Sequence, residues 1–233
     1  WIKSKGRASH SSLPFLGQNA IKPLLEFIQN IDQEYEKITQ SVKGESLDFS
    51  NMINNLGSQL PNHITKEKAQ ELIQGLVMTN SIVHGGTQVN SVPDFATAEF
   101  NVRTIPEYNN NKVKALFNEY IEQANQNGAS LTQELYLDLE PVVTTGQNRL
   151  VELGFDIAKS HFSNARDLIV TPTVAVTDAS NLLKGKDEKF PFLMFGPGNG
   201  PHQINECVEK ANYLEFVEYY IEFITSYLNE ENE

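Results

Sequence analysis

The hydrophobic pattern of the first half of the chain changes between helical and strand spacing. Apolar side chains recur every three or four positions from Ile21 to Ile38, which predicts an amphipathic helix over residues 19–42. Residues 95–104 instead alternate apolar and polar side chains. This alternation predicts a strand with one buried face, and its other face presents Asn101 and Arg103 to a polar environment.

The remaining strands and a second helix of the first half complete a known order of secondary-structure elements. A short first strand lies within residues 1–10, and a partner strand over 78–84 ends at the turn signal Gly85-Gly86. A helix over 109–125 is stopped by Gly128, and alternating leucines over 135–139 predict a last strand. The β-α-β-β-α-β order predicts a ferredoxin-like domain, in which helices cover one face of a sheet.

A segment between the first helix and the second strand interrupts this order. Residues 43–62 are polar and rich in turn residues, so we expect an inserted loop there. Thr65 then resembles an N-cap for a short helix that runs through Gln74 and stops at Gly75.

The pattern changes after Gly146. A helix over 150–162 precedes an apolar, strand-like run over 168–176, and a second short strand over 191–195 precedes a loop rich in Gly and Pro. A final helix carries a stripe of apolar residues and begins with Asn212 and Glu215 placed like a capping box. The stripe consists of Leu214, Val217, Ile221, Ile224 and Leu228.

The fold class that we predict is therefore α/β (α+β) in two parts. Residues 1–144 form a ferredoxin-like β-α-β-β-α-β domain with an insertion near 43–77. Residues 145–233 form an α/β portion with parallel layers, because strands there alternate with helices.

Composition narrows the possible partners. The 233 residues carry 18 Lys and Arg against 30 Asp and Glu, a net charge of −12, which argues against a nucleic-acid partner. No run approaches the ~20 apolar residues that a membrane-spanning helix needs, so we expect no membrane partner. The single cysteine, Cys207, excludes an internal disulfide and fits the cytoplasm. The chain begins at Trp1, which predicts a fragment or a trimmed chain.

Of the five histidines, His202 has the most informative surroundings. It follows the end of a predicted strand within FGPGNGPHQINECV, residues 195–208. Ligands of open α/β sheets bind beyond the carboxyl ends of strands, so His202 is a candidate zinc ligand that Glu206 could orient. On spacing alone, a loop held together by histidine hydrogen bonds is the competing interpretation.

Four segments together resemble the di-zinc amidohydrolases of metallopeptidase family 20, which include aminoacylase, acetylornithine deacetylase, carboxypeptidase G and succinyl-diaminopimelate desuccinylase. KGRASHSSLPFLGQNAI (residues 5–21) resembles the G-x-x-x-H opening of the family's lid domain. HGGTQVNSVPDFATAEFNVRTIPE (84–107) resembles its G-G…N-x-x-P-D…R segment, and VAVTDASNLL (174–183) resembles a small substrate-facing loop. The segment 195–208 resembles the terminal metal-ligand motif, and its NECV ending is most like that of the desuccinylase members.

The resemblance assigns roles to individual residues. His202 matches the terminal zinc ligand. His10 matches a catalytic lid histidine that crosses the dimer and donates to the developing oxyanion. Asn90 and Arg103 match residues that hold the substrate, and the Arg103 guanidinium suits a substrate carboxylate. An ordinary exposed arginine remains the alternative for Arg103.

Further substrate-binding positions follow from the same resemblance. Thr177 and Asp178 match the substrate-facing loop, although Asp178 could equally cap a helix that starts at Ala179. In the Gly-rich loop the matches are Gly196, Gly198 and Asn199; there, turn glycines are the competing interpretation.

The family's remaining metal ligands are not found in this sequence. They belong to an H-x-D motif, a bridging Asp and a Glu-Glu pair, and one Glu of the pair is the general base. The Glu-Glu pair at residues 230–231 belongs to an acidic tail and is not in a catalytic setting. The resemblance therefore implies a lid domain plus the C-terminal part of a catalytic domain. We expect this part to be inactive alone and to hold no complete zinc site.

For the complete enzyme, the resemblance implies a homodimer through the lid domain and two zinc ions, with cobalt or manganese as alternatives. Metal-activated water would hydrolyse a small N-acylated amino acid, N-succinyl-LL-2,6-diaminopimelate, to succinate and LL-diaminopimelate for lysine and cell-wall synthesis. One rival is another deacylase or dipeptidase of the family. A second rival is a non-catalytic ferredoxin-like dimerisation or binding module. The sequence upstream of Trp1 would separate the enzyme from the module.

Overall fold

A computed structural model describes residues 1–44, 48–142, 148–162, 168–173, 177–186, 189–198 and 204–229. The chain divides into two compact units. Unit 1 comprises the described residues of 1–142 and 174–184, and unit 2 comprises those of 143–173 and 185–233. No helix among the described residues is long and apolar enough to cross a membrane.

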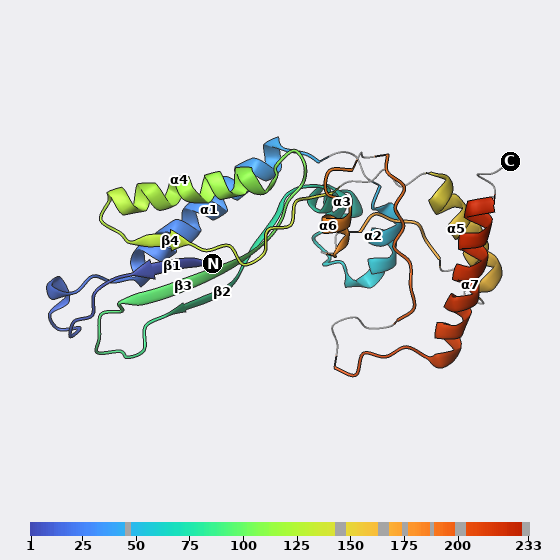
Figure 1. Ribbon diagram of the computed structural model, residues 1–233. Coiled ribbons are helices and arrows are strands. Elements are labelled where there is room, and N and C mark those ends of the chain that lie inside the picture. Colours follow the sequence, from blue (N-terminus) through green and yellow to red (C-terminus); the bar gives the residue numbers. More distant parts are fainter. Residues whose placement is uncertain are drawn as a thin grey trace. The chain divides into compact units, whose positions relative to one another are not determined.

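Unit 1 is built on a four-stranded sheet with the order β2-β3-β1-β4, in which every neighbouring pair is antiparallel. The helices α1 and α4 cover one face of this sheet (Figure 1). This arrangement confirms the ferredoxin-like plan and the fold class. The elements are β1 (Ile2–Lys5), α1 (Ile21–Ser41), β2 (Val77–Gly85), β3 (Phe95–Arg103), α4 (Asn110–Gln126) and β4 (Leu131–Gln133).

The core of unit 1 explains why the alternation along β3 was informative. Ala96 and Ala98 face the helices and are almost fully buried. Beyond them, the rings of Phe27, Phe100 and Phe117 meet edge to face, with centroids 5.1–6.3 Å apart. Such aromatic contacts stabilise a core beyond the burial of area alone. The apolar face of β3 therefore fixes the positions of α1 and α4, and its polar face is left uncovered.

The last strand lies earlier than the sequence predicts. The alternating leucines of 135–139 are not in a strand, and Leu135 and Leu137 are more than half exposed. The strand β4 instead pairs with β1 from Leu131 to Gln133, and the ladder ends where the Glu134 amide donates to the Trp1 carbonyl. The position of the partner strand, and not the alternation, decides which residues pair.

The polar segment 43–62 also differs from the expected loop. Within its described part, α2 (Ser50–Leu56) and a short 3-10 helix, η2 (Gly57–Gln59), pack with α3 (Lys66–Gln74) around a small core of their own. That core contains Phe49 and Ile53, two apolar residues that are spaced one helical turn apart. The Thr65 cap is confirmed, because its side chain accepts from the Lys68 amide at 3.2 Å.

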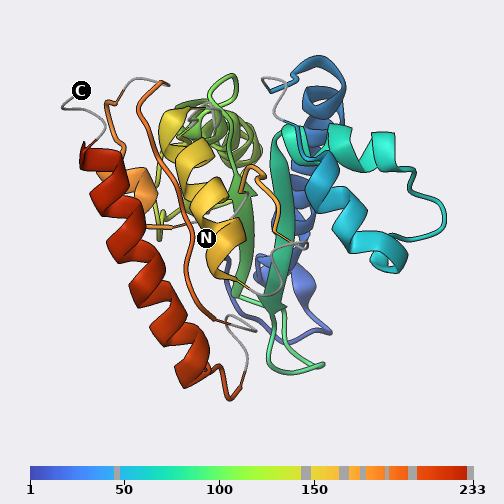
Figure 2. The same cartoon turned by 90° about the vertical axis from the view of Figure 1, so that its right-hand side faces the viewer.

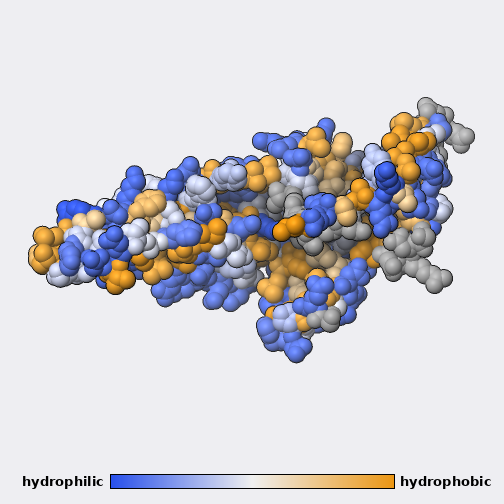
Figure 3. Space-filling model, turned by 90° about the horizontal axis from the view of Figure 1, so that it is seen from below, coloured by the Kyte–Doolittle hydropathy of each residue, from blue (hydrophilic) through white to orange (hydrophobic). Residues whose placement is uncertain are grey.

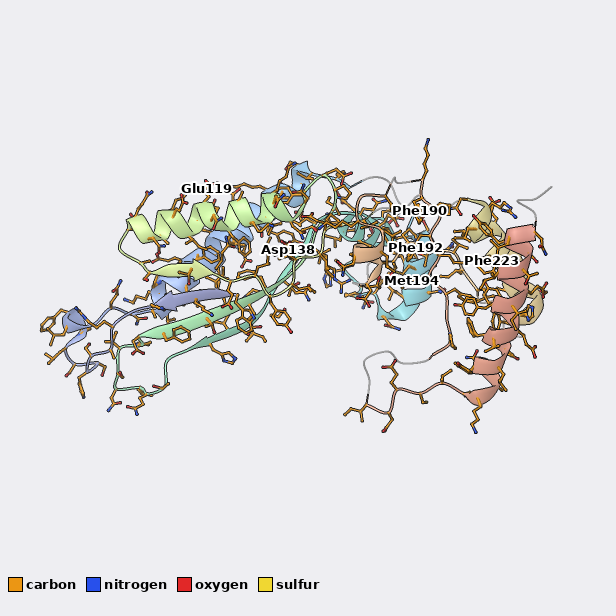
Figure 4. All side chains as sticks on the ribbon, viewed as in Figure 1. Glu119, Asp138, Phe190, Phe192, Met194 and Phe223 are labelled. Carbon is orange, nitrogen blue, oxygen red and sulfur yellow. The ribbon has the colours of Figure 1, made fainter. Side chains whose placement is uncertain are left out.

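Unit 2 is organised by two helices, α5 (Arg149–His161) and α7 (Lys210–Asn229), which lie side by side (Figure 2). Aromatic rings fill the space between them, and the buried Tyr219 hydroxyl donates to the Gly154 carbonyl at 3.1 Å. Figure 4 labels Phe223, another buried ring on α7. The aromatic cluster consists of Phe162, Phe195, Phe216, Tyr219 and Phe223.

The two short strands and the capping box predicted for unit 2 are wrong in the described residues. Residues 168–173 and 191–195 adopt no strand. Figure 4 labels Phe192 and Met194 in the second segment and Phe190 directly before it. The helix α7 already begins at Lys210, so Asn212 lies inside it and is not a cap. The predicted apolar stripe of α7 is exposed, from 41% at Val217 to 64% at Ile221. The adjacent aromatic face is buried instead, because its larger rings pack against α5.

Candidate functional site

The loop that carries His10 is a compact excursion of unit 1 between β1 and α1. The backbones of Arg7 and Gln18 exchange two hydrogen bonds of 2.9 and 2.8 Å, which close the loop at its base. A short 3-10 helix, η1 (Pro14–Leu16), forms its outer part. Gly6 is required at the base, because a Cβ there would overlap the Gln18 carbonyl oxygen. The first glycine of the G-x-x-x-H segment is thus a packing requirement of the loop.

The imidazole of His10 is exposed and held in one tautomer. The Ser12 backbone amide donates to His10 Nδ1 at 3.2 Å, and the Ser12 hydroxyl lies 2.7 Å from the same atom. An amide N–H can only donate, so Nδ1 is an acceptor and the proton of the neutral ring is on Nε2. His10 therefore presents an Nε2–H donor outward, which is the state that an oxyanion donor needs.

Asn90 lies beside His10 although 80 positions separate them in the sequence. The Ser11 amide donates to the Asn90 carbonyl at 2.9 Å, and His10 forms an antiparallel bridge with Ser91. Asn90 itself is exposed at the turn after β2. The structure thus brings together two of the predicted site residues, and we call this end of unit 1 the His10 end.

Arg103 lies at the opposite end of the sheet. It is the last residue of β3 and is exposed on the face that the helices leave uncovered, as its polar position in the alternation predicts. The His10 end adjoins the other end of β3, where Lys5 pairs with Phe95. The nine residues of β3 extend over about 26 Å at roughly 3.3 Å per residue. One small amide cannot therefore contact His10 and Arg103 of the same chain.

The surroundings of Arg103 form a polar cluster that ties four segments together. Next to it, the Thr104 hydroxyl donates to Asn110 Oδ1 at 2.6 Å, and the Asn110 amide donates to Asp138 Oδ1 at 2.7 Å. The Lys114 ammonium lies 3.0 Å from the Asp138 carboxylate and, with Asn110, lowers the pKa of that carboxyl. Lys184 also contributes to this lowering, so the segment around Lys184 lies near this Arg103 end.

Thr177 and Asp178 belong to unit 1 and precede α6 (Ala179–Leu182). The Ala179 amide donates to the Thr177 hydroxyl at 3.1 Å, whereas the Asp178 side chain makes no capping hydrogen bond. Asp178 nevertheless occupies the N-cap position, and its backbone carbonyl accepts from Asn181 and Leu182. The side-chain hydrogen bond to the start of α6 therefore comes from Thr177 and not from Asp178, which the sequence offers as a possible cap.

Two of the glycine-loop residues are described, and both lie in unit 2. Gly198 has φ +141°, a conformation that L-residues rarely adopt, so its glycine is needed for the backbone itself. Gly196 is exposed and follows Phe195, whose carbonyl accepts from the Tyr220 hydroxyl. Asn199 and His202 lie outside the described residues, so their predicted roles remain predictions.

A metal centre does not fit the part of the chain that is described. Across those residues, no group of three or more His, Cys, Asp and Glu side chains is placed to hold a metal ion. His202, the metal ligand that the resemblance predicts, lies outside the described residues, so its role stays a prediction.

Sequence reasoning missed Ser12 and the structural role of Gly6. Ser12 stands two positions after His10, a spacing at which Ser side chains commonly bond back to the local chain. The H-x-S order was the available signal. The sequence shows Gly6 only as the glycine of the G-x-x-x-H motif, because the close approach of the Gln18 carbonyl arises only in the folded loop.

Residues 1–129 match the family described as "Peptidase dimerisation domain" (M20_dimer). Over the whole chain, similar curated relatives are proteins named "Probable succinyl-diaminopimelate desuccinylase". One from Staphylococcus epidermidis is 36% identical over 229 residues, which cover 97% of this chain and 55% of the relative. One from Staphylococcus aureus MRSA252 is 35% identical over 231 residues, with 98% and 55% covered. The chain therefore spans about half the length of these relatives.

A solved structure with the same fold is the M20 family metallo-carboxypeptidase Sso-CP2 from Sulfolobus solfataricus. It superposes with a TM-score of 0.66 at 17% identity over 95% of this chain and 56% of that protein. At this identity, the similarity concerns the fold alone.

Proposed function

The chain belongs to the M20 peptidase family, and from this premise we propose that it is part of a metal-dependent amidohydrolase that cleaves N-succinyl-LL-2,6-diaminopimelate to succinate and LL-diaminopimelate. The observation that carries the proposal is the identity of 35–36% over nearly the whole chain to relatives that bear the desuccinylase name. We place the reaction in the cytoplasm, in lysine and cell-wall synthesis.

In this proposal, unit 1 is the lid and dimerisation domain, and a second copy of the chain completes the site. Support comes from the separation of about 26 Å along β3, which leaves His10 and Arg103 of one chain too far apart for one substrate. Two copies resolve this problem, because the His10 end of one protomer can serve the Arg103 end of the other. Each of the two sites in a homodimer then combines residues of both chains.

The edge strand β2 is the proposed contact between the two copies. It has nine residues and an open outer edge, whereas the opposite edge strand, β4, has only three. Ile82 and Val83 are 40% and 46% exposed along it. A long, partly apolar edge is a ready template for pairing with an identical strand about a two-fold axis.

We propose that the chain's own residues bind and polarise the substrate. Arg103 would hold a substrate carboxylate with its two-pronged guanidinium, supported by Asn90 of the other copy. His10 would direct its Nε2–H at the amide carbonyl oxygen, where negative charge develops in the transition state. Because the Ser12 amide donates to Nδ1 of His10, the Nε2–H group is the donor that the neutral ring can offer to the substrate.

Unit 2 would be part of a larger catalytic domain. Support comes from its exposed apolar surface: residues 168–173 and 191–195 are apolar but not in strands, and the aliphatic stripe of α7 faces outward. We propose that zinc, with cobalt or manganese as alternatives, is held by His202 together with ligands that the described residues do not provide. No step of the reaction is assigned to that metal.

The activity is tested with the complete gene product that carries this chain. We expect metal-loaded protein to hydrolyse N-succinyl-LL-2,6-diaminopimelate with a kcat/KM at least tenfold above that for N-acetylornithine and for dipeptides. A preference for an acetylated amino acid or a dipeptide would contradict the proposed desuccinylase activity and would favour another deacylase or dipeptidase of the family. Absence of hydrolysis of all three would favour a binding module.

The composite site is tested by complementation between two inactive variants. In a heterodimer of His10→Ala and Arg103→Ala chains, one site lacks both residues and the other retains both. We therefore expect co-expressed variants to regain up to half of the wild-type activity per heterodimer, although each variant alone is impaired. If both residues served the same chain's site, every site would lack one of them and no activity would return.

A further inference from the structure

The face of the sheet opposite α1 and α4, which we call the uncovered face, carries one acid among its described strand residues. This acid is Glu99, in the middle of β3. The lysine and arginine side chains of the same face are Lys3, Lys5 and Arg103 on β1 and β3. Hydrophilic residues make up much of the surface of unit 1 in Figure 3, which views the molecule from the side opposite α4. The uncovered face thus combines three cations with one acid.

Glu99 makes no ion pair with another described residue, although a lysine is close by. Lys3 is diagonal to Glu99 across the ladder between β1 and β3, because it pairs with Thr97. Its ammonium group instead pairs with Glu134 and lies 5.7 Å from the centroid of the Trp1 ring. The Glu99 side chain is partly buried. A positively charged ligand would therefore be attracted more strongly there than at a fully exposed acid, because less water screens the charges.

The neighbouring strand is irregular at the position of Glu99. The register of β2 on β3 shifts between Asn80 and Ile82, and Ile82 is the residue opposite Glu99. The Asn80 side-chain amide spans this bulge, since it donates to the Glu99 carbonyl at 2.9 Å and to the Ile82 carbonyl at 3.4 Å. Bulges are common next to functional sites, where they redirect a side chain. The bulge singles out Glu99 independently of its charge.

The spacing of Glu99 and Arg103 matches the two ends of the proposed substrate. They are four positions apart on one face of β3, which places their Cα atoms about 13 Å apart at roughly 3.3 Å per residue. In N-succinyl-LL-2,6-diaminopimelate, about nine bonds separate the succinyl carboxyl carbon from the carbon that bears the free ammonium group, or about 11 Å in an extended chain. A carboxylate at Arg103 and an ammonium group at Glu99 therefore fit one extended molecule.

We propose that Glu99 binds the free ammonium group of the substrate while Arg103 of the same chain binds its succinyl carboxylate, so that the uncovered face selects N-acylated diamino acids. This inference rests on the proposed desuccinylase function and adds the residue that recognises the second amine. The three carboxylates and one ammonium group of the substrate complement the three cations and one acid of the face. An analogue without the second amine leaves the Glu99 carboxylate without a partner and is disfavoured.

The test compares N-succinyl-LL-2,6-diaminopimelate with N-succinyl-L-2-aminopimelate, which lacks only the second amine, as substrates of the complete gene product. We expect the wild type to prefer the diamino compound by about tenfold to a hundredfold in kcat/KM, because the analogue loses a hydrogen bond between charged groups. Glu99→Gln keeps the size of the side chain and removes its charge. It should lower kcat/KM for the diamino compound by the same factor and leave that for the analogue unchanged. Equal losses for both compounds, or no loss for either, would overturn the role of Glu99.

Glu119→Gln is the matched control. Glu119 is exposed on α4, in the helix layer on the other face of the sheet (Figure 4), so this variant removes the same charge from the same unit. We expect it to keep the wild-type kcat/KM for both compounds. A selective loss as large as that of Glu99→Gln would show that net charge, and not the position of Glu99, sets the preference.

Binding of the product separates this inference from the proposed reaction. In calorimetric titrations of the complete protein, Glu99→Gln should bind LL-diaminopimelate about tenfold more weakly than the wild type does and L-2-aminopimelate equally well. If the wild type hydrolyses neither succinyl compound but shows this difference, the reaction is wrong and the role of Glu99 stands. If it neither hydrolyses the succinyl compounds nor binds LL-diaminopimelate, both proposals are overturned.

Discussion

Replacing Gly6 by Ala should destabilise the base of the His10 loop, so that unit 1 unfolds at a lower urea concentration than in the wild type. The added Cβ would overlap the Gln18 carbonyl oxygen, far inside the 3.0 Å that real Cβ atoms keep. This overlap cannot be relieved by a side-chain rotation, because the obstacle is a backbone atom and not the end of a flexible side chain. Gly6 and Gln18 must therefore move apart, and the paired hydrogen bonds between Arg7 and Gln18 lie directly in the way.

The magnitude follows from these contacts. Loss of the two backbone hydrogen bonds costs about 2 kcal/mol, at about 1 kcal/mol each. Residual strain from overpacking adds about 1–2 kcal/mol. The free energy of unfolding of unit 1 should therefore fall by about 3–4 kcal/mol. At an m-value of about 2 kcal/mol/M, the urea midpoint should fall by about 1.5–2 M.

The fluorescence of Trp1 provides an assay that reports unit 1 specifically. Trp1 is the single tryptophan, and it stacks on Tyr136 with ring centroids 6.2 Å apart, so unfolding of the β1–β4 pair separates the two rings and changes the Trp1 emission. Gly75→Ala is the matched control, because a Cβ there meets nothing closer than 3.7 Å. We expect the control to stay within about 0.5 kcal/mol of wild type. A Gly6→Ala midpoint equal to that of Gly75→Ala would refute the argument from close approach.

Three further predictions concern the chemistry of single side chains. Arg103→Ala should lower kcat/KM by about one to two orders of magnitude on a dicarboxylate substrate, because a charge-assisted hydrogen bond contributes roughly 1.5–3 kcal/mol. The kcat/KM of Arg103→Lys should fall between that of Arg103→Ala and that of the wild type. A wild-type kcat/KM for Arg103→Ala would disprove the carboxylate clamp. Ser12→Ala should lower kcat about fivefold with KM little changed, because the hydroxyl contact to His10 Nδ1, about 1 kcal/mol, is lost and only the backbone amide still orients the ring. Ser12→Thr should restore kcat, and a change in KM alone would speak against positioning. Burial raises the pKa of Tyr219 to about 12, so the unfolded chain ionises first, and stability is constant below pH 10 and falls as pH rises towards 12. Between pH 9 and 11, wild type should lose about 1.4 kcal/mol more than Tyr219→Phe in urea titrations followed by circular dichroism, and equal losses would contradict this assignment.

The sequence alone determined most of unit 1, because its elements are encoded locally. The alternation from Ala96 to Val102, the Thr65 cap and the glycine stop at Gly128 each carry their own physical reason, and the structure confirms all three. The order of those elements leaves few ways to form a sheet with covering helices, so the ferredoxin-like plan followed from the sequence as well.

The tertiary structure decided the matters that depend on which partner is available. The leucines of 135–139 alternate like a strand, but the ladder with β1 ends at Glu134. The two apolar faces of α7 look alike in the sequence, and only packing shows that the aromatic one is buried against α5. A local pattern records a preference for burial, whereas the neighbour that provides burial can lie anywhere along the chain.

For the candidate site, too, the sequence determined some features and the tertiary structure determined others. His10, Asn90 and Arg103 could be selected from the sequence because the motifs around them resemble those of the family's lid domain. Their positions could not, since only the folded sheet places Asn90 beside His10 and leaves Arg103 at the other end of β3, a strand about 26 Å long. Sequence thus determines which chemical groups a chain carries, and strand pairing across distant segments determines which of them can meet one substrate.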